Sequence, residues 1–289
     1  MVTCLHRSFW MYFRSSAEFF RRSFLIVCLW VFCGLSPVDA QLSVLSWNLK
    51  DFGHSKTDNE IDFIASIISR HDVVAIQEVV AGPGGAQAVA RLVAALNRTG
   101  NKWDYDVSSV TSGSSAYKAE RYAFIWKNAK VKKIEKGWLE KHYGNEIERE
   151  PFFCRFQAAG KTFTLVNFHA ITKSKQPERE VKYFKFFPAL YPSDKLLFCG
   201  DFNLPQFHNV FNPLKQMGYR PALTGQKTSL RQKCLQQDCL ASEFDNFFFN
   251  PVDHKVKNPG AFHFYRHFDD LKSARKLTDH IPIYLTLYP

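Results

Sequence analysis

The chain has few cysteines and, after its first 40 residues, no long apolar segment. Its seven cysteines form no CxxC pair and no Cys/His cluster, which excludes a zinc site of the finger type. No heptad pattern, repeat or low-complexity linker is present, so a long coiled coil is excluded and no domain boundary is indicated. A dense block of Lys and Arg is absent as well.

The composition is that of a globular protein. Apolar residues make up 46% of the 289 residues, which is too many for a disordered chain. About 250 residues can bury a large core without metals or disulfides. The 38 Lys and Arg exceed the 27 Asp and Glu, for a net charge of +11. This favours an anionic partner such as nucleic acid, anionic lipid or a phosphorylated metabolite, although a merely soluble cationic protein has the same balance.

Residues 1–40 are predicted to be an export signal. Four arginines precede the apolar run 24–35, and Val38-Asp39-Ala40 offers small residues at both cleavage-determining positions. We therefore expect a secreted or periplasmic protein that starts at Gln41. Twelve apolar residues are too few for a comfortable span, but an uncleaved anchor, with membrane contact, is the alternative. Removing four Arg and two acidic residues leaves 34 and 25, so a charge of +9 remains.

Four cysteines follow the signal. Cys234 and Cys239 are close together in a polar stretch, and export would allow them to form a disulfide. Cys154 and Cys199 lie in apolar, strand-like runs and are predicted to be buried free thiols.

Many predicted strands, with helices between some of them, indicate a layered α+β architecture, and two packed sheets flanked by helices would fit it. A break is expected at the glycine cluster 82–85, and irregular structure over 218–241. Helices are predicted at 59–70, after 85, at 178–187 and at 207–217. Strands are predicted at 43–49, 72–79, 103–109, 120–127, 130–136, 152–157, 162–168, 195–199, 242–249 and 281–287.

Polar residues follow or interrupt the apolar strands, where a sheet edge can gather catalytic groups. Oxygen donors predominate, and a small all-oxygen set suits Mg²⁺ or Mn²⁺, with Ca²⁺ as a structural ion. This set comprises Asn48, Glu78, Asp201, Asn203 and Asp279.

Two histidines and two further carboxylates supply proton-transfer chemistry. His169 and His280 titrate near neutral pH, and Glu120 and Asp245 are suited to orient them. Each residue alone has an ordinary structural interpretation, such as a strand-end charge, a turn cap or a core histidine. Asp245 is the exception, because a carboxylate between aromatic residues is costly to bury unpaired. Together, the groups match hydrolysis of a phosphate ester.

These residues resemble the endonuclease/exonuclease/phosphatase superfamily, and within it the deoxyribonuclease I branch. GDFN and a late DHxP in this order are strong signals for the superfamily, whereas ERY and REP favour the deoxyribonuclease branch. The resemblance covers almost all of the mature chain, 41–289. It rests on Ser46-Trp47-Asn48, Ile76-Gln77-Glu78-Val79, Glu120-Arg121-Tyr122, Arg149-Glu150-Pro151, Phe168-His169-Ala170, Gly200-Asp201-Phe202-Asn203, Ser242-Glu243-Phe244-Asp245 and Thr278-Asp279-His280-Ile281-Pro282.

The resemblance implies a four-layer α/β sandwich with two central, mostly antiparallel sheets. It implies that Asn48 and Glu78 hold the cation with Asp279 nearby, and that Asp201 and Asn203 lie against the scissile phosphate or a second cation. Glu120 would pair with His169, and Asp245 with His280. Arg149, Asn203 and Tyr117 would contact substrate phosphate, a role that suits the planar guanidinium of arginine.

The chain departs from the branch in three places. Pancreatic members carry an Arg two places after the motif Glu that reaches into the DNA minor groove, and here that residue is Val80. Their neighbouring Tyr has only an offset counterpart in Tyr117, and the small cysteine loop has no match at 234–239.

The sequence therefore predicts an exported, divalent-cation-dependent phosphodiesterase, most plausibly a deoxyribonuclease with DNA as substrate. It is expected to be a monomer without a stable protein partner. His280 is assigned as base and His169 as acid, with the reverse order open. A lipid or sugar phosphodiesterase of the sphingomyelinase type is the alternative, favoured by the Phe-rich segments 184–187 and 247–249. An inactive nucleic-acid-binding module is a further alternative.

Overall fold

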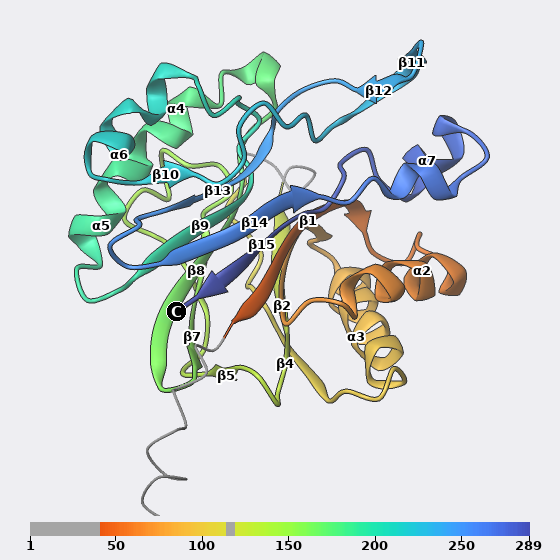
Figure 1. The fold of residues 1–289 in the computed structure, drawn as a ribbon, viewed down its shortest axis with the longest axis horizontal. Coiled ribbons are helices and arrows are strands. Elements are labelled where there is room, and N and C mark those ends of the chain that lie inside the picture. Colours follow the sequence, from red (N-terminus) through yellow and green to blue (C-terminus); the bar gives the residue numbers. More distant parts are fainter. Residues whose placement is uncertain (1–40, 114–118) are drawn as a thin grey trace, which may run out of the picture. The chain divides into compact units, whose positions relative to one another are not determined.

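The computed structural model describes residues 41–113 and 119–289. The predicted signal, residues 1–40, and Tyr117 lie outside the described residues. Two β-sheets pack face to face, and helices cover the outer face of each, so the chain has the predicted layered α+β architecture (Figure 1). No helix within 41–113 or 119–289 is long and apolar enough to cross a membrane.

The first sheet has six strands in the order β14-β15-β1-β2-β4-β3. Only β1 and β2 run parallel, and every other pair is antiparallel. The strands are β1 (Leu42–Phe52), β2 (Val73–Val80), β3 (Trp103–Val107), β4 (Glu120–Lys127), β14 (Lys255–Ala261) and β15 (Ile283–Tyr288).

The second sheet follows the order β10-β13-β9-β8-β7-β5, with β6 also paired to β7. Here β8 and β9 are the one parallel pair. The strands are β5 (Lys132–Lys133), β6 (Trp138–Leu139), β7 (Phe152–Ala158), β8 (Lys161–His169), β9 (Leu196–Asp201), β10 (Arg220–Pro221) and β13 (Asp245–Phe249).

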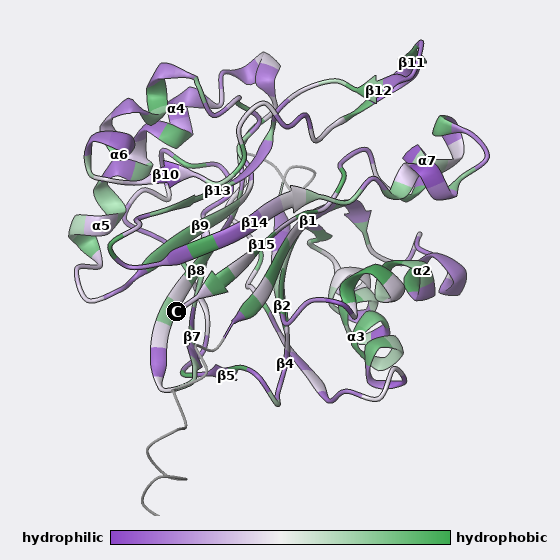
Figure 2. Ribbon diagram, in the orientation of Figure 1, coloured by the Kyte–Doolittle hydropathy of each residue, from purple (hydrophilic) through white to green (hydrophobic). Residues whose placement is uncertain are grey.

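Helices α2 (Asp58–Ile68) and α3 (Pro83–Asn97) cover the first sheet, and α4 (Glu178–Val181), α5 (Phe187–Leu190) and α6 (Asn212–Gln216) cover the second (Figure 1). A reciprocal capping box between Thr57 and Glu60 starts α2 by satisfying two of its free N–H groups. Figure 2 shows hydrophobic residues in the strands and in α3, and the buried residues of α3 include Val89, Leu92, Val93 and Leu96.

The core between the sheets is built from alternate residues of both. Val44 and Phe124 of the first sheet pack with Leu165 and Phe247 of the second, all fully buried. Cys154 and Cys199 lie in the same core as free, buried thiols, as predicted.

Two local predictions were wrong. The glycine cluster is not a break, because α3 begins at Pro83 with Gly82 as its extended N-cap. Gly85 serves close packing, since a Cβ there would lie 2.1 Å from the carbonyl oxygen of Val80. Residues 218–241 are not irregular throughout, because they contain a hairpin of β11 (Leu230–Leu235) and β12 (Asp238–Leu240).

The hairpin is closed by a disulfide between Cys234 and Cys239. It projects from the body of the fold beyond the sheets (Figure 1). The pairing that export would allow is therefore present.

The Phe-rich segments are core rather than an exposed apolar loop. Phe184 and Phe187 are buried under the second sheet's helices, and Phe247 and Phe248 are buried within the sheet. Phe186 alone is exposed, at 41%. The observation that favoured a lipid substrate is thereby removed.

Candidate active site

The site lies where β1, β2, β8, β9 and β13 meet at one edge of the two sheets. Bulges in β1 and β2 aim its side chains. The pairing of these strands shifts between Asn48 and Phe52, and Lys50, Asp51 and Glu78 have positive φ angles of 36°, 49° and 59°. Such conformations are costly for residues other than glycine and gather at functional sites, where they direct a side chain.

Three oxygen-bearing side chains converge at this edge. Asn48 Nδ2 donates to Glu78 Oε1 at 2.9 Å and to Asp201 Oδ2 at 3.2 Å. The other oxygen of Glu78 accepts the N–H of Asp51 at 3.1 Å, and Asn48 Oδ1 accepts that of Lys50 at 3.0 Å. Backbone N–H groups of the β1 bulge thus hold the side chains of Asn48 and Glu78 in place.

His169 ends β8 and is fixed by Glu120. Its Nδ1 lies 2.9 and 3.0 Å from the two Glu120 oxygens, and its backbone N–H donates to the buried Tyr122 hydroxyl at 3.2 Å. Burial, together with the charge of Arg149, lowers the pKa of His169 to about 4. Burial also raises the pKa of Glu120 to about 8, against the opposing charge of Arg149. The imidazole is therefore neutral at pH 7.

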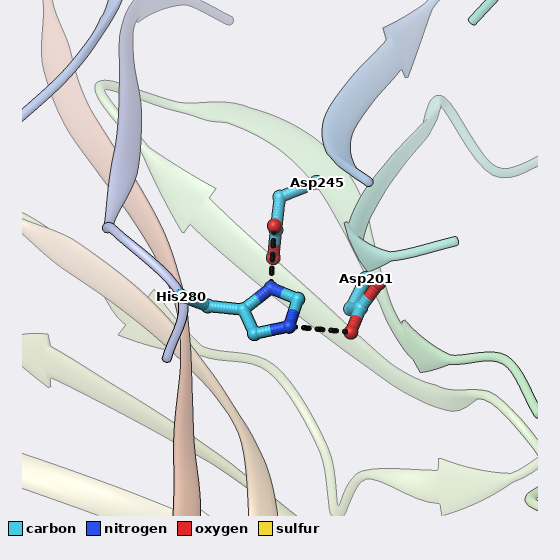
Figure 3. A group of neighbouring side chains, drawn as sticks. All are labelled: Asp201, Asp245 and His280. Atoms are coloured by element: carbon cyan, nitrogen blue, oxygen red, sulfur yellow. Dashed lines mark hydrogen bonds and ion pairs between the residues drawn. The ribbon is translucent and has the colours of Figure 1, made fainter. Parts of the chain in front are cut away.

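His280 is the counterpart from the other sheet, just before β15. Its Nδ1 lies 2.7 Å from Asp245 Oδ2, and its Nε2 lies 3.6 Å from Asp201 Oδ2 (Figure 3). Burial acts to lower the pKa of His280, but the carboxylates of Asp245 and Asp201 together hold it well above its ordinary value. The pKa values of the two imidazoles are thus shifted in opposite directions.

Backbone and hydroxyl contacts set the position of this second pair. Thr278 Oγ1 accepts the His280 N–H at 3.2 Å and donates to the Asn48 carbonyl at 2.7 Å. Thr228 Oγ1 accepts the Asp245 N–H at 3.0 Å. The imidazole, its carboxylate and Asn48 are thus linked across both sheets.

Asn203 and Arg149 border the cluster. Asn203 has a φ of +51°. It donates its backbone N–H to Asp201 Oδ1 at 2.9 Å, and its Nδ2 donates to the Ala170 carbonyl at 3.0 Å. Arg149 Nε donates to the His169 carbonyl at 3.0 Å, Nη2 donates to that of Ala170, and Nη1 lies 3.5 Å from Glu120. Arg149 thus supports His169 as well as facing the cleft.

Asp279 has two cationic neighbours. Its carboxylate lies 3.2 Å from Arg275 and 3.8 Å from Lys50 Nζ. Lys50 was not among the predicted site residues, although it lies two residues after Asn48. In a basic chain, one more lysine gives no distinctive signal.

Two open hollows meet at Glu78, His169 and Thr172. The first hollow, of about 510 Å³, is bordered by Glu120, Arg149 and the Val80–Gly82 stretch, among others. The second hollow, of about 410 Å³, contains Asp201, Asn203, Asp279 and His280 on its walls. Together they form a cleft across the two histidines, and Tyr117 cannot be placed in it because it lies outside the described residues.

The donor set fits a hard divalent cation. Asp201 is 1% exposed, and its carboxylate and that of Glu78 face the same Asn48 amide. The partial positive charge of the Asn48 NH₂ group faces the two carboxylates, and a cation between them would provide a full positive charge. Asp201, Asp245 and His280 also offer ligand atoms within 4.8 Å of one another, but His280 Nδ1 already contacts Asp245. We therefore take Asn48, Glu78 and Asp201 as the better-suited set. In this structure Asn48 faces the two carboxylates with Nδ2, and its ligand atom, Oδ1, accepts the Lys50 N–H.

The model of the endonuclease/exonuclease/phosphatase family matches residues 45–280, which contain every residue of this site. The chain belongs to this family. It is accordingly a hydrolase that acts on phosphodiester bonds.

Relatives with curated names include deoxyribonucleases. A "Deoxyribonuclease" of Thioalkalivibrio sp. (strain K90mix) is 26% identical over 268 residues, which cover 85% of this chain and 71% of that protein. "Deoxyribonuclease-1" of Gallus gallus is 29% identical over 181 residues, which cover 58% of this chain and 63% of that protein.

Solved structures share the fold. A family member from Bacteroides thetaiotaomicron has a TM-score of 0.61 at 16% identity, covering 86% of this chain and 97% of its own. Danio rerio TDP2, crystallised with a single-stranded DNA product, has a TM-score of 0.60 at 15% identity, covering 86% of this chain and all of its own, 100%. At such identities the likeness concerns the fold alone.

Proposed function

We propose that this protein is an exported, divalent-cation-dependent deoxyribonuclease. The observation that carries the proposal is the convergence of two imidazole–carboxylate pairs on one oxygen. Nε2 of His169 and Nε2 of His280 each lie 3.6 Å from Asp201 Oδ2, with Glu78 and Asn48 beside them. The named deoxyribonucleases among the relatives support DNA as the substrate.

In the proposed reaction, water attacks the phosphorus in line with the leaving oxygen. One imidazole accepts the proton of the water and the other donates a proton to the leaving oxygen. Glu120 and Asp245 keep the Nδ1 atoms protonated and the rings oriented, so each Nε2 faces the scissile phosphate. Asn203 and Arg149 line the cleft, where their remaining N–H groups can meet phosphate oxygens.

Asn48, Glu78 and Asp201 would hold the cation, which neutralises charge that develops on the phosphoryl oxygens. His280 must first release its proton to serve as the base. Charge compensation at Asp201 would favour this release, because Asp201 is one of the two carboxylates that hold the proton on His280. The reverse order, with His169 as base and His280 as acid, is the alternative.

Export is supported by the hairpin disulfide. Disulfides persist in oxidising compartments and are rare in the cytosol. The Cys234–Cys239 bond therefore agrees with the signal predicted for residues 1–40. A secreted or periplasmic enzyme is the localisation we propose.

Plasmid DNA and sphingomyelin, each with and without Mg²⁺, test the proposal. Mature protein from Gln41 onward is expected to nick the plasmid only with Mg²⁺ and to leave sphingomyelin intact. Cleavage of sphingomyelin alone would replace the nuclease by the lipid phosphodiesterase, and no turnover of either substrate would favour the inactive binding module.

A further inference from the structure

The segment Thr172–Lys175 begins three residues after His169 and lines both hollows of the cleft. Thr172 and Lys175 border the first hollow, and Thr172, Lys173 and Ser174 border the second. All four residues are exposed. The segment therefore runs along the catalytic centre, with a lysine toward the hollow on each side of it.

The lysines of this segment are uncompensated. Among the described residues, neither Lys173 nor Lys175 takes part in an ion pair, whereas other cations at the cleft do: Lys50 lies near Asp279, and Arg149 near Glu120. An unpaired ammonium beside a phosphate-ester cleft offers its full charge to a ligand.

Positive charge is scarce among the other described residues that line the first hollow. They are uncharged, such as Val80, Ala81 and Gly82, or acidic, namely Asp51, Glu78, Glu120 and Glu148. Lys175 and Arg149 are therefore the described lysine and arginine that this hollow offers to a polyanion.

The segment is held firmly in relation to the catalytic residues. The carbonyl of Ala170, just before it, accepts from Asn203 Nδ2 at 3.0 Å and from Arg149. The N–H of Ile171 donates to the buried Glu180 carboxylate at 2.8 Å. A 3₁₀ turn, Lys173–Lys175, follows and closes at Gln176 in the left-handed conformation, with φ of 62°. The lysine stems therefore project from a fixed backbone.

We propose that Thr172–Lys175 is a phosphate-binding segment that holds the nucleic-acid strand on both sides of the scissile bond, through Lys175 in the first hollow and Lys173 in the second. The inference rests on the proposed nuclease function and adds to it the ligand of the segment, the flanking phosphodiesters of a polynucleotide. It predicts backbone recognition independent of base sequence, since phosphate contacts position a strand without reading it.

The test replaces both lysines, as Lys173→Gln with Lys175→Gln. The matched control is Lys130→Gln with Lys132→Gln, because these lysines are also exposed and two residues apart, and they lie at the other end of the second sheet. Both double variants remove two charges, so a difference between them is not an effect of net charge. The Michaelis constant and kcat are measured on duplex DNA with Mg²⁺ at several salt concentrations.

The cleft variant is expected to have a higher KM, on the order of 10- to 60-fold at 0.1 M salt, and a slope of log KM against log salt that is flatter by about 1.8. The kcat is expected to change little, because flanking phosphates are held alike in the ground state and the transition state. Lys173→Arg with Lys175→Arg should keep the salt slope of the unaltered protein.

A cleft variant with the same KM and salt slope as its control would overturn the phosphate-binding segment while leaving the nuclease intact. An unaltered protein that fails to cut DNA would instead overturn the proposed function, and the segment's role with it.

Discussion

His169 and His280 belong to different sheets, yet their Nε2 atoms lie at equal distances of 3.6 Å from one oxygen of Asp201. His169 ends β8 of the second sheet, and His280 precedes β15 of the first. Asp201, at the end of β9, is thus the point on which both layers converge. Packing of the two sheets against each other, rather than any local sequence element, determines this geometry.

The first prediction concerns these histidines. His169→Ala and His280→Ala should each lower kcat by roughly 10²–10⁴-fold, the usual contribution of a general acid or base. The double variant should fall by much less than the product of the two losses, because the residues act as a unit. Single-turnover cleavage of a plasmid measures the rate of each of these three variants. A His280→Ala protein with nearly unaltered turnover would refute the mechanism.

The carboxylate partners are expected to act through the imidazoles. Asp245→Asn and Glu120→Gln should therefore lose no more rate than the corresponding histidine variants. In a background of His280→Ala, adding Asp245→Asn should cost little more. A large additional loss in that double variant would mean that Asp245 has a function of its own.

The second prediction concerns the cation. EDTA should abolish cleavage, and Mg²⁺ or Mn²⁺ should restore it. Glu78→Gln should raise the Mg²⁺ concentration for half-maximal rate by at least roughly 10–100-fold, because it weakens an oxygen ligand. The exposed Glu146→Gln is the matched control. Full activity after exhaustive chelation would remove the metal site, and a lower melting temperature for Glu78→Gln would mean that this carboxylate serves the fold.

The third prediction concerns how duplex DNA is read. Val80 borders the first hollow, so an arginine there can extend into the cleft. An arginine in the minor groove responds to groove width, which makes cleavage uneven along a sequence. The unaltered protein should therefore cut an end-labelled duplex more evenly than a pancreatic-type enzyme, and Val80→Arg should sharpen the pattern. The exposed Val252→Arg, 92% exposed, adds the same charge elsewhere and should leave it flat.

The fourth prediction concerns acid stability. Burial lowers the pKa of His71, away from the cleft, to about 4, although Asp72 opposes the shift. Its Nδ1 lies 2.7 Å from the Ser43 hydroxyl. Below pH 6.5 the unfolded chain binds a proton that folded His71 does not, so the free energy of unfolding falls until the pH reaches about 4.

Urea unfolding at pH 7.5 and pH 5 measures this effect. Between pH 7.5 and pH 5, the loss in the free energy of unfolding should be about 2 kcal/mol smaller for His71→Gln than for the unaltered protein. This value corresponds to about 1.36 kcal/mol for each pH unit between 6.5 and 5. The exposed His54→Gln should behave like the unaltered protein. Equal losses in all three proteins would show that His71 does not resist protonation.

The sequence predicted the strands that carry the site because their signals are local. Apolar runs such as 73–80, and polar residues at the ends of strands, can be recognised in the sequence without knowledge of the tertiary contacts. The pairs Glu120–His169 and Asp245–His280 came from family resemblance, since their members are 49 and 35 residues apart and no local pattern joins them.

Elements that depend on tertiary contacts were missed. Strand β14 has a proline, a glycine and charged residues, and it exists because it pairs with β15 at the edge of the sheet. Helix α7 (Leu271–Leu277) is only seven residues long and buries two side chains, Ala274 and Leu277. Gly85 was misinterpreted because a glycine that makes room for a backbone looks the same in sequence as one that allows a turn.

The two ends of the disulfide hairpin lie next to the catalytic pair of Asp245 and His280. Ser229, at its base, bridges to His280, and Thr228 N–H donates to the Ser242 carbonyl at 2.7 Å, three residues before Asp245. The outer strands β11 and β12 pair only with each other among the described elements. The length of the hairpin and the residues at its tip can therefore change in evolution or by engineering, through insertion or replacement beyond Leu230. The position of Asp245 against His280 would stay the same.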